Sequence, residues 1–263
     1  MTWLEAIVLG LIQGLTEFLP VSSSGHLELG KYLFGMDHEA NFYFSVAVHG
    51  ATVLSTLAAL WAEIVTLFKG FIKFRLNDET KYVIKIVISM IPVGIAGFFL
   101  KDIVDNFFAG NMISLGVEFL ISAVILALTL VIKPKERPMG YLDSFIIGIA
   151  QAVAVLPAIS RSGATIATGM MLGNKKSDIA KFSFLMVLVP IIGANIVEMK
   201  SGDFTTEGTS FIVILTGFIT AFISGYFACK WMIELVKKGN LFWFAAYCIL
   251  VGIFSLLLGL NVF

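Results

Sequence analysis

"TEFLPVSSSGHLEL", residues 16–29, places a carboxylate, three successive hydroxyls, a glycine and a histidine inside a strongly apolar sequence. The chain of 263 residues is 58% hydrophobic and only 14% charged, whereas a soluble domain carries about 25% charged residues. The apolar residues are spread over the whole length, so we predict an all-α polytopic membrane protein with a single membrane domain over 1–263. Polar groups are costly at membrane depth, and this stretch therefore needs a specific explanation.

Most of the chain divides into apolar stretches of about 20 residues, the length that a helix needs to cross a bilayer. Six transmembrane helices are predicted at 42–68, 82–100, 112–132, 178–199, 210–233 and 241–262. Two further regions, 4–35 and 143–173, are apolar at both ends and broken in the middle by Pro, Ser and Gly. Broken backbone is tolerated at this depth only where it is buried in protein or lines a cavity. We therefore predict that both regions are re-entrant helix hairpins.

The basic residues predict how these segments are oriented. Most of the 18 Lys and Arg residues lie in four places, at 69–85, 133–137, 175–181 and 230–238. Six spans and two re-entrant hairpins put all four places on one face, which the positive-inside rule makes cytoplasmic. Both termini should then lie outside.

The chain also contains an internal repeat, because "LGLIQGLTEFLPVSSSGHLELG" (9–30) is similar to "IGIAQAVAVLPAISRSGATIATG" (147–169). A constant offset matches Gly10 with Gly148, Gln13 with Gln151, Ser22 with Ser160, Ser24 with Ser162, and Gly25 with Gly163. Repeat one, about 1–132, and repeat two, about 139–263, each hold one broken hairpin followed by three spans. Since three is odd, the second copy must be inverted in the membrane. Many secondary transporters have inverted repeats with broken helices, so transport is one functional hypothesis.

The two breaks carry different chemistry. Glu17 and His26 lie at the first break, and Arg161 lies at the second. The serines fall where N-caps of the second half-helices are expected, and such helix N-termini bind anions. An arginine has a fork geometry that suits phosphate, while Glu and His can move protons or hold a divalent ion. The combination predicts a site for a phosphate ester or anhydride.

Each of these residues also has a purely structural explanation. The serines could only cap helices, His26 could only bridge two helices, and Arg161 could pair with a carboxylate inside the bundle. However, three ionisable groups at two repeat-related breaks favour a functional site. His49 lies inside a predicted span, and we expect it to make an interhelical hydrogen bond.

Two motifs resemble the signatures of a known family. "QGLTEFLPVSSSGHL" and "LPAISRSGATIATGMMLG" resemble the first and second signatures of bacterial undecaprenyl pyrophosphate phosphatases of the bacitracin-resistance type. The resemblance extends over the whole chain in length and segment order. It implies a multi-pass enzyme of the bacterial inner membrane that hydrolyses undecaprenyl pyrophosphate to undecaprenyl phosphate. That product is the lipid carrier recycled for peptidoglycan and cell-wall synthesis.

The resemblance also implies roles for individual residues. The catalytic residues would be Glu17, Ser23, His26 and Arg161. Substrate binding would involve Gln13, Ser22, Ser24, Gly25, Ser160, Ser162, Gly163 and Thr165. The family implies a divalent cation, Mg²⁺ or Ca²⁺. Many members have glutamate where this chain has Gln13, so Glu17 is the only protein carboxylate that we expect to contact the ion.

Several alternatives stay open at this level. Ser23, His26 or a water molecule could attack the phosphorus, and a flippase of polyprenyl phosphate lipids is the alternative function. A lipid phosphatase of the phosphatidic-acid type is rejected, because Ala167 stands where that family needs its second-motif histidine. The expected partners are undecaprenyl pyrophosphate and the bilayer, with no nucleic acid, and a homodimer is left open. Because the first hairpin enters from outside, we expect the site to open to the periplasmic or extracellular side.

Overall fold

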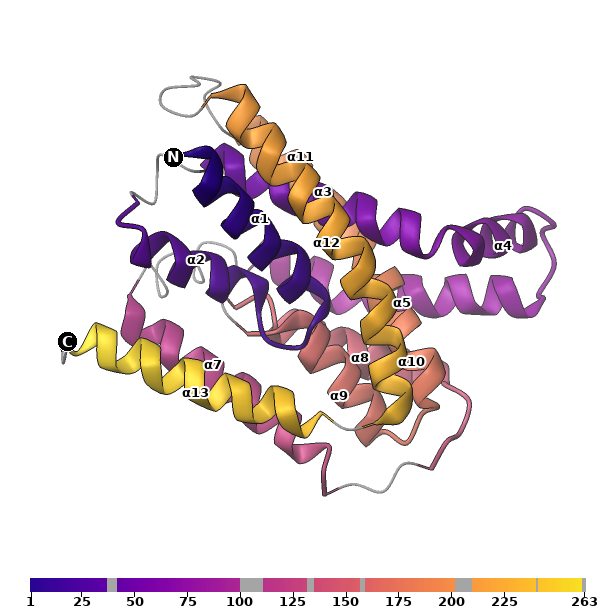
Figure 1. Cartoon of the computed structure of the whole chain (residues 1–263). Helices are drawn as coiled ribbons and strands as arrows, with labels where there is room; N and C mark the ends of the chain where they lie inside the picture. The colour runs from indigo at the N-terminus through magenta and orange to yellow at the C-terminus, as the bar shows by residue number, and fades with distance from the viewer. Residues whose placement is uncertain are drawn as a thin grey trace.

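The computed structural model describes residues 1–36, 42–99, 111–131, 135–156, 159–201, 210–239 and 241–261 (Figure 1). Across these ranges the chain is helical and forms no strand, as predicted. The helices are α1 (Trp3–Phe18), α2 (Ser23–Leu33), α3 (Phe42–Ala59), α4 (Trp61–Phe71), α5 (Asp78–Phe99), α7 (Met112–Leu128), α8 (Tyr141–Val153), α9 (Arg161–Met171), α10 (Lys176–Met186), α11 (Leu188–Ser201), α12 (Phe211–Lys238) and α13 (Phe242–Gly259).

Five of the six predicted spans correspond to helical segments that are long and apolar enough to cross a membrane. These segments are Asp78–Gly97, Met112–Val131, Lys176–Val197, Phe211–Lys238 and Phe242–Gly259. The third of them contains both α10 and α11. These segments indicate a multi-pass membrane protein.

The span predicted at 42–68 is not one continuous helix. The chain bends by 72° between α3 and α4, at Leu60. The bend lets α4 pack along α5, where Gly70 leaves room for the side chain of Glu79. Glu63 on α4 also accepts a hydrogen bond from Lys181 on α10, at 2.5 Å. These contacts away from the α3 axis explain why an apolar run of sufficient length does not stay straight.

The two regions predicted to be broken are helix–turn–helix hairpins. The first consists of α1 and α2, and the second of α8 and α9. In the first hairpin α1 ends two residues before Pro20, and in both hairpins the second helix begins directly after a serine. Proline has no backbone N–H to donate, which accounts for the end of α1, and serine is a favoured N-cap, which accounts for the start of α2 and of α9.

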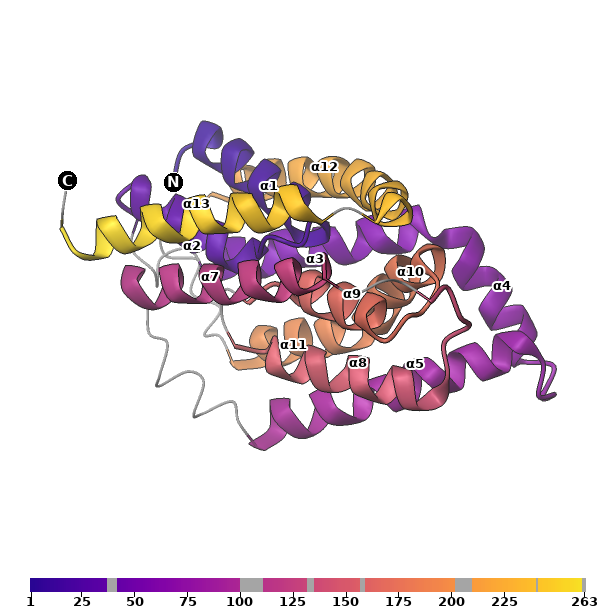
Figure 2. The same ribbon diagram turned by 90° about the horizontal axis from the view of Figure 1, so that it is seen from below.

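Each hairpin packs against the long helix of the other half of the chain. α1 lies along α12, and α8 lies along α5, while α7 and α13 form a further pair (Figures 1 and 2). The repeat-related glycines make both approaches possible. A Cβ at Gly10 would lie 2.6 Å from the carbonyl oxygen of Gly217, and one at Gly148 would collide with the carbonyl of Ser89. Small residues allow helix backbones to approach closely in this way.

Candidate active site

The first hairpin brings Glu17 and Ser23 together, although six positions separate them in sequence. α1 ends just before Pro20, and Ser22 caps α2 by accepting a hydrogen bond on Oγ from Gly25 N at 3.2 Å. The chain doubles back between these residues. Ser23, at the first position of α2, therefore lies against the last turn of α1.

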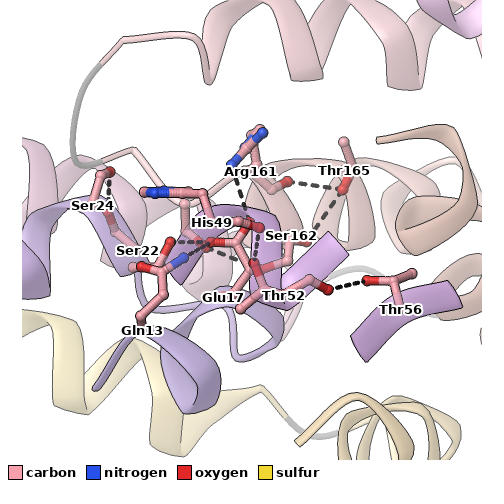
Figure 3. Close-up of polar contacts among 12 residues, drawn as sticks. Gln13, Glu17, Ser22, Ser24, His49, Thr52, Thr56, Arg161, Ser162 and Thr165 are labelled. Atoms are coloured by element: carbon pink, nitrogen blue, oxygen red, sulfur yellow. Dashed lines mark hydrogen bonds and ion pairs between the residues drawn. The ribbon is translucent and has the colours of Figure 1, made fainter. Parts of the chain in front are cut away.

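The Glu17 carboxylate is the centre of a hydrogen-bonded cluster (Figure 3). Its Oε2 accepts from Ser23 Oγ at 2.5 Å and from Gln13 Nε2 at 2.8 Å, and its Oε1 accepts from Arg161 Nη2 at 3.1 Å. The Glu17 side chain is 9% exposed, whereas the Arg161 side chain is 30% exposed. The carboxylate is thus buried and fully engaged, while the guanidinium keeps accessible surface for an anionic ligand.

The second hairpin presents Arg161 from the first turn of α9. Ser160 caps this helix, with its Oγ accepting from Gly163 N at 3.0 Å. Ser162 Oγ donates to the carbonyl oxygen of Leu19, in the turn of the first hairpin, at 3.1 Å. The two tips are therefore in direct contact, and Arg161 reaches the first hairpin from the second.

The remaining predicted binding residues support the turns. The hydroxyls of Ser22 and Ser24 lie 3.4 Å apart. Thr165 Oγ1 donates to the carbonyl oxygen of Arg161 at 2.8 Å and lies 2.6 Å from Ser183 Oγ. These contacts hold the half-helices that present Ser23 and Arg161.

The structure places the His26 side chain of α2 against Tyr247 and Phe119, and no hydrogen bond between His26 and Glu17 is described. Its Nδ1 lies 2.7 Å from the carbonyl oxygen of Ser22, and its Nε2 lies 2.7 Å from the Tyr247 hydroxyl on α13. Its ring also stacks on Tyr247 and meets the edge of Phe119. A carbonyl oxygen only accepts, so Nδ1 carries the proton, and in the neutral ring Nε2 accepts from Tyr247. Both nitrogens are committed, and His26 braces the turn that contains Ser22.

Helix α3 supplies polar residues that the sequence motifs did not indicate. His49 and Thr52 lie next to Glu17 (Figure 3). The contact described for His49 Nδ1 is to the Ser45 carbonyl of its own helix, at 2.8 Å, and the interhelical bond stays a prediction. His49, Thr52 and Thr56 recur at helical spacing within an apolar helix, and this spacing is the signal that could have identified them.

A small pocket lies between the two hairpin tips and α3, α10 and α11. It is lined by Glu17, Phe18, Thr52, Thr56, Gln151, Arg161, Ser162, Thr165, Ser183, Phe184, Val187 and Ile191. Its lining comes from both halves of the chain. Among its polar lining residues, Thr52, Thr56, Gln151 and Ser183 were not among the predicted site residues.

The described residues do not form a preformed cage for a divalent ion. They contain no group of three or more His, Cys, Asp or Glu side chains that could hold a metal. Glu17 is the only carboxylate of the cluster, and Arg161, Ser23 and Gln13 already donate to it. A Ca²⁺ or Mg²⁺ site built from protein alone would need more oxygen ligands than this.

Comparison with known proteins identifies the family. The family described as "Bacitracin resistance protein BacA" matches residues 6–254. The chain belongs to this family. The match includes the tips of both hairpins and every residue of the Glu17 cluster.

Relatives resemble the chain over nearly its full length. A Bacteroides thetaiotaomicron protein named "Undecaprenyl-diphosphatase" is 52% identical over 257 residues, which cover 96% of this chain and 97% of the relative. A protein of the same name from Parabacteroides distasonis is 50% identical over 97% of this chain and 98% of its own length. One from Methanosphaera stadtmanae is 36% identical over 97% of each chain.

Proposed function

We propose that this chain is an undecaprenyl-diphosphatase, which hydrolyses undecaprenyl pyrophosphate to undecaprenyl phosphate and inorganic phosphate in the membrane. This activity recycles the lipid carrier for cell-wall synthesis and gives bacitracin resistance. Family membership supports the reaction class, since relatives carrying this name match almost the whole chain. The observation that carries the assignment of the site is the contact of Glu17 with both Ser23 and Arg161.

In the proposed reaction Ser23 attacks the terminal phosphorus. Ser23 Oγ already donates its proton to Glu17, so Glu17 can accept this proton as the new P–O bond forms. The bond from that phosphorus to the bridging oxygen breaks, and undecaprenyl phosphate leaves. Arg161 neutralises the negative charge of the transferred phosphoryl group, which is the main requirement of phosphoryl transfer. Hydrolysis of phosphoserine then releases inorganic phosphate.

Ser23 is preferred to His26 as the nucleophile because of the hydrogen bonds of His26. The Ser22 carbonyl and Tyr247 engage both of its ring nitrogens. Attack by His26 would give phosphohistidine and direct attack by water would give no covalent adduct, so the alternatives can be distinguished by trapping. Quenching during turnover, with acid in one sample and with alkaline denaturant in a second, is followed by mapping of bound phosphate. It gives acid-stable phosphoserine at residue 23, base-stable phosphohistidine at residue 26, or no adduct.

We further propose that the hairpin tips bind the pyrophosphate through a common set of groups. Arg161 provides the charge, and the polar residues around it position the phosphates. These residues are Gln13, Ser22, Ser24, Gly25, Ser160, Ser162, Gly163 and Thr165. A divalent cation, Mg²⁺ or Ca²⁺, would then enter with the pyrophosphate oxygens and use Glu17 as its single protein carboxylate.

The topology proposed for the chain is six spans and two re-entrant hairpins, related as inverted repeats 1–132 and 139–263. The reciprocal packing of α1 on α12 and of α8 on α5 supports this arrangement, because it pairs each hairpin with the equivalent helix of the other half. Opening to the periplasmic side is part of the same proposal, and cysteine labelling of the hairpin tips in whole cells tests it. The remaining question is whether the protein is a monomer or a homodimer. Light scattering in detergent measures this.

A flippase of polyprenyl phosphate lipids is the second candidate. The same reciprocal packing favours it, because inverted repeats with broken helices are typical of secondary transporters. Such a protein would bind the phosphate through Arg161 without cleaving it. Both activities could also reside in one fold.

The deciding experiment measures inorganic phosphate released from a polyprenyl pyrophosphate by the purified protein in detergent. The phosphatase proposal expects catalytic release that is lost in Arg161→Ala and Glu17→Ala. The phosphatase proposal is refuted if folded wild-type protein releases no phosphate with Mg²⁺ or Ca²⁺ present. If both variants still release phosphate, the active site lies elsewhere in the protein.

A further inference from the structure

Gln151 is a buried polar residue that the reaction described above does not use. It lies on α8, is 1% exposed and lines the pocket between the hairpin tips. Within the described part of the chain, neither its Oε1 nor its Nε2 has a hydrogen-bond partner. A buried amide that makes no hydrogen bond is costly, so its position in the pocket indicates a missing ligand.

The internal repeat explains why the Nε2 of Gln151 is free. Its counterpart Gln13 donates from Nε2 to Glu17, which lies one helical turn further along α1. The same step along the second hairpin, from Gln151, leads to Val155, which offers no side-chain acceptor. The glutamine is present in both copies, while its acidic partner is present only in the first.

The chemistry of the amide limits what the ligand can be. A phosphate oxygen would satisfy the Nε2 donor but would repel the Oε1 acceptor, and a cation would do the reverse. A water molecule can donate to Oε1 and accept from Nε2. The nearby hydroxyls agree, because Thr52 and Thr56 donate their own protons to the carbonyls of His49 and Thr52, at 2.8 and 3.0 Å, and so present lone pairs (Figure 3).

The size of the pocket also indicates a water molecule as the ligand. Its volume is about 20 Å³, and a cavity needs roughly 10–15 Å³ to hold one water. The space is therefore sufficient for a water molecule. Glu17 and Arg161 line the same pocket, so a water held there lies beside the groups that handle the phosphoryl group.

We propose that Gln151 is a positioning residue that binds and orients the water which hydrolyses the phosphorylated enzyme. The proposal rests on the phosphatase function and on Ser23 as nucleophile. In this step the water oxygen forms a bond to phosphorus, and the bond from phosphorus to Ser23 Oγ breaks. Before this step, Glu17 passes the proton that it took from Ser23 to the departing undecaprenyl phosphate. One water proton then passes to Glu17 and from there to Ser23 Oγ, and inorganic phosphate leaves. Water-positioning glutamines have this role in other phosphoryl-transfer enzymes.

The test compares wild type with Gln151→Met, which keeps the length of the side chain and removes both hydrogen-bonding groups. With a polyprenyl pyrophosphate radiolabelled in its terminal phosphate, we expect kcat to fall about 100-fold, the effect of misplacing one reactant. KM should not rise, and acid-stable phosphoserine should accumulate at residue 23. Gln151→Glu keeps an acceptor oxygen for the water, and it should recover part of the lost rate with less phosphoenzyme.

A matched control is Ser255→Ala on α13. Ser255 is fully buried, and its hydroxyl has no partner in the described ranges, but it does not line the pocket. This variant should keep the wild-type rate. If it does and Gln151→Met also keeps the wild-type rate, the proposal is wrong. A loss of rate without phosphoenzyme, or a rise in KM of the same size, would also overturn it.

Two safeguards keep the result interpretable. If Gln151→Met fails to fold in detergent, Gln151→Glu decides alone, since a slow, phosphoserine-accumulating enzyme supports the proposal and any other behaviour contradicts it. Absence of phosphate release from wild type would be a failure of the proposed function. The Gln151 inference fails separately, when wild type is active and the variants do not accumulate phosphoserine.

Discussion

Ser22 in the first hairpin has a φ of 68°, whereas its repeat partner Ser160 in the second hairpin has a φ of −66°. Both serines cap the helix that follows, through the N–H groups of Gly25 and Gly163. The cap is therefore common to both hairpins, and the left-handed backbone belongs to one. A non-glycine residue in this region costs roughly 1–3 kcal/mol, and such strain is often found at functional sites. Here it occurs directly before Ser23.

The two hairpins also differ in their charged and reactive residues. The position that carries Ser23 in the first copy carries Arg161 in the second, and the position of Glu17 carries Val155. Both copies share the capped, broken helix, whereas the reactive groups differ between the copies. One complete site therefore needs both hairpins. The predictions below test this division, beginning with the largest expected effect.

Removing either charge should have the largest effect. We expect Glu17→Gln and Arg161→Gln each to lower kcat/KM for phosphate release by at least about 1,000-fold, because proton acceptance and charge neutralisation are both lost from the chemical step. Glu63→Gln is the control, since Glu63 pairs with Lys181 outside the cluster. Losses below ten-fold in either charge variant would contradict a shared site.

The serines of the two hairpins should differ in importance. Ser23→Ala removes the hydroxyl bonded to Glu17, and we expect at least about a 100-fold loss of activity with no phosphoenzyme. Ser162→Ala removes the bond to the Leu19 carbonyl and the weaker 3.3 Å contact with the Ser160 hydroxyl, together worth about 1 kcal/mol, or about five-fold in rate. Steady-state kinetics on both variants make the comparison, and equal losses would show that Ser23 has no special role.

Tyr247→Phe tests whether His26 braces the turn or takes part in the chemistry. The substitution removes one hydrogen bond to His26 Nε2 and keeps the stacked ring. We expect kcat to fall by no more than about five-fold with KM unchanged, the effect of one hydrogen bond. A loss as large as that of Ser23→Ala would instead place His26 among the catalytic residues.

The smallest effects concern the stability of the two caps. Ser22→Gly should raise the thermal unfolding temperature, because glycine removes strain of about 1 kcal/mol and costs only a few tenths as a cap. Ser160→Gly relieves no backbone strain and loses the side-chain cap, so it should lower the thermal unfolding temperature. Thermal unfolding of both variants in detergent checks the two signs. A decrease for both would mean that the Ser22 backbone is not strained.

Much of this arrangement was predictable from sequence, because it depends on local rules. Proline followed by serine marks both breaks, and the repeat aligns the capping residues. Glu17 and Arg161 lie at the two repeat-related breaks, and this combination predicted one phosphate site. These features require only turn chemistry, apolar length and the internal offset.

The remaining features depend on tertiary contacts that no local pattern contains. His26 turns toward Tyr247, more than two hundred residues away, and this contact engages its Nε2. Thr52 and Gln151 look like ordinary polar residues of apolar helices until the pocket places them beside Glu17. The bend at Leu60 depends on packing against α5 and α10, and hydropathy does not report it.

A double-mutant cycle on Glu17 and Arg161 tests the shared site most directly. The cycle compares kcat/KM for phosphate release in wild type, Glu17→Gln, Arg161→Gln and the double variant. If the two side chains act as one unit, the double variant should be within about ten-fold of the worse single variant, because residues of one catalytic unit are strongly non-additive. If the double variant instead shows the full product of the two single losses, the hairpins act independently and the account of a shared site is wrong.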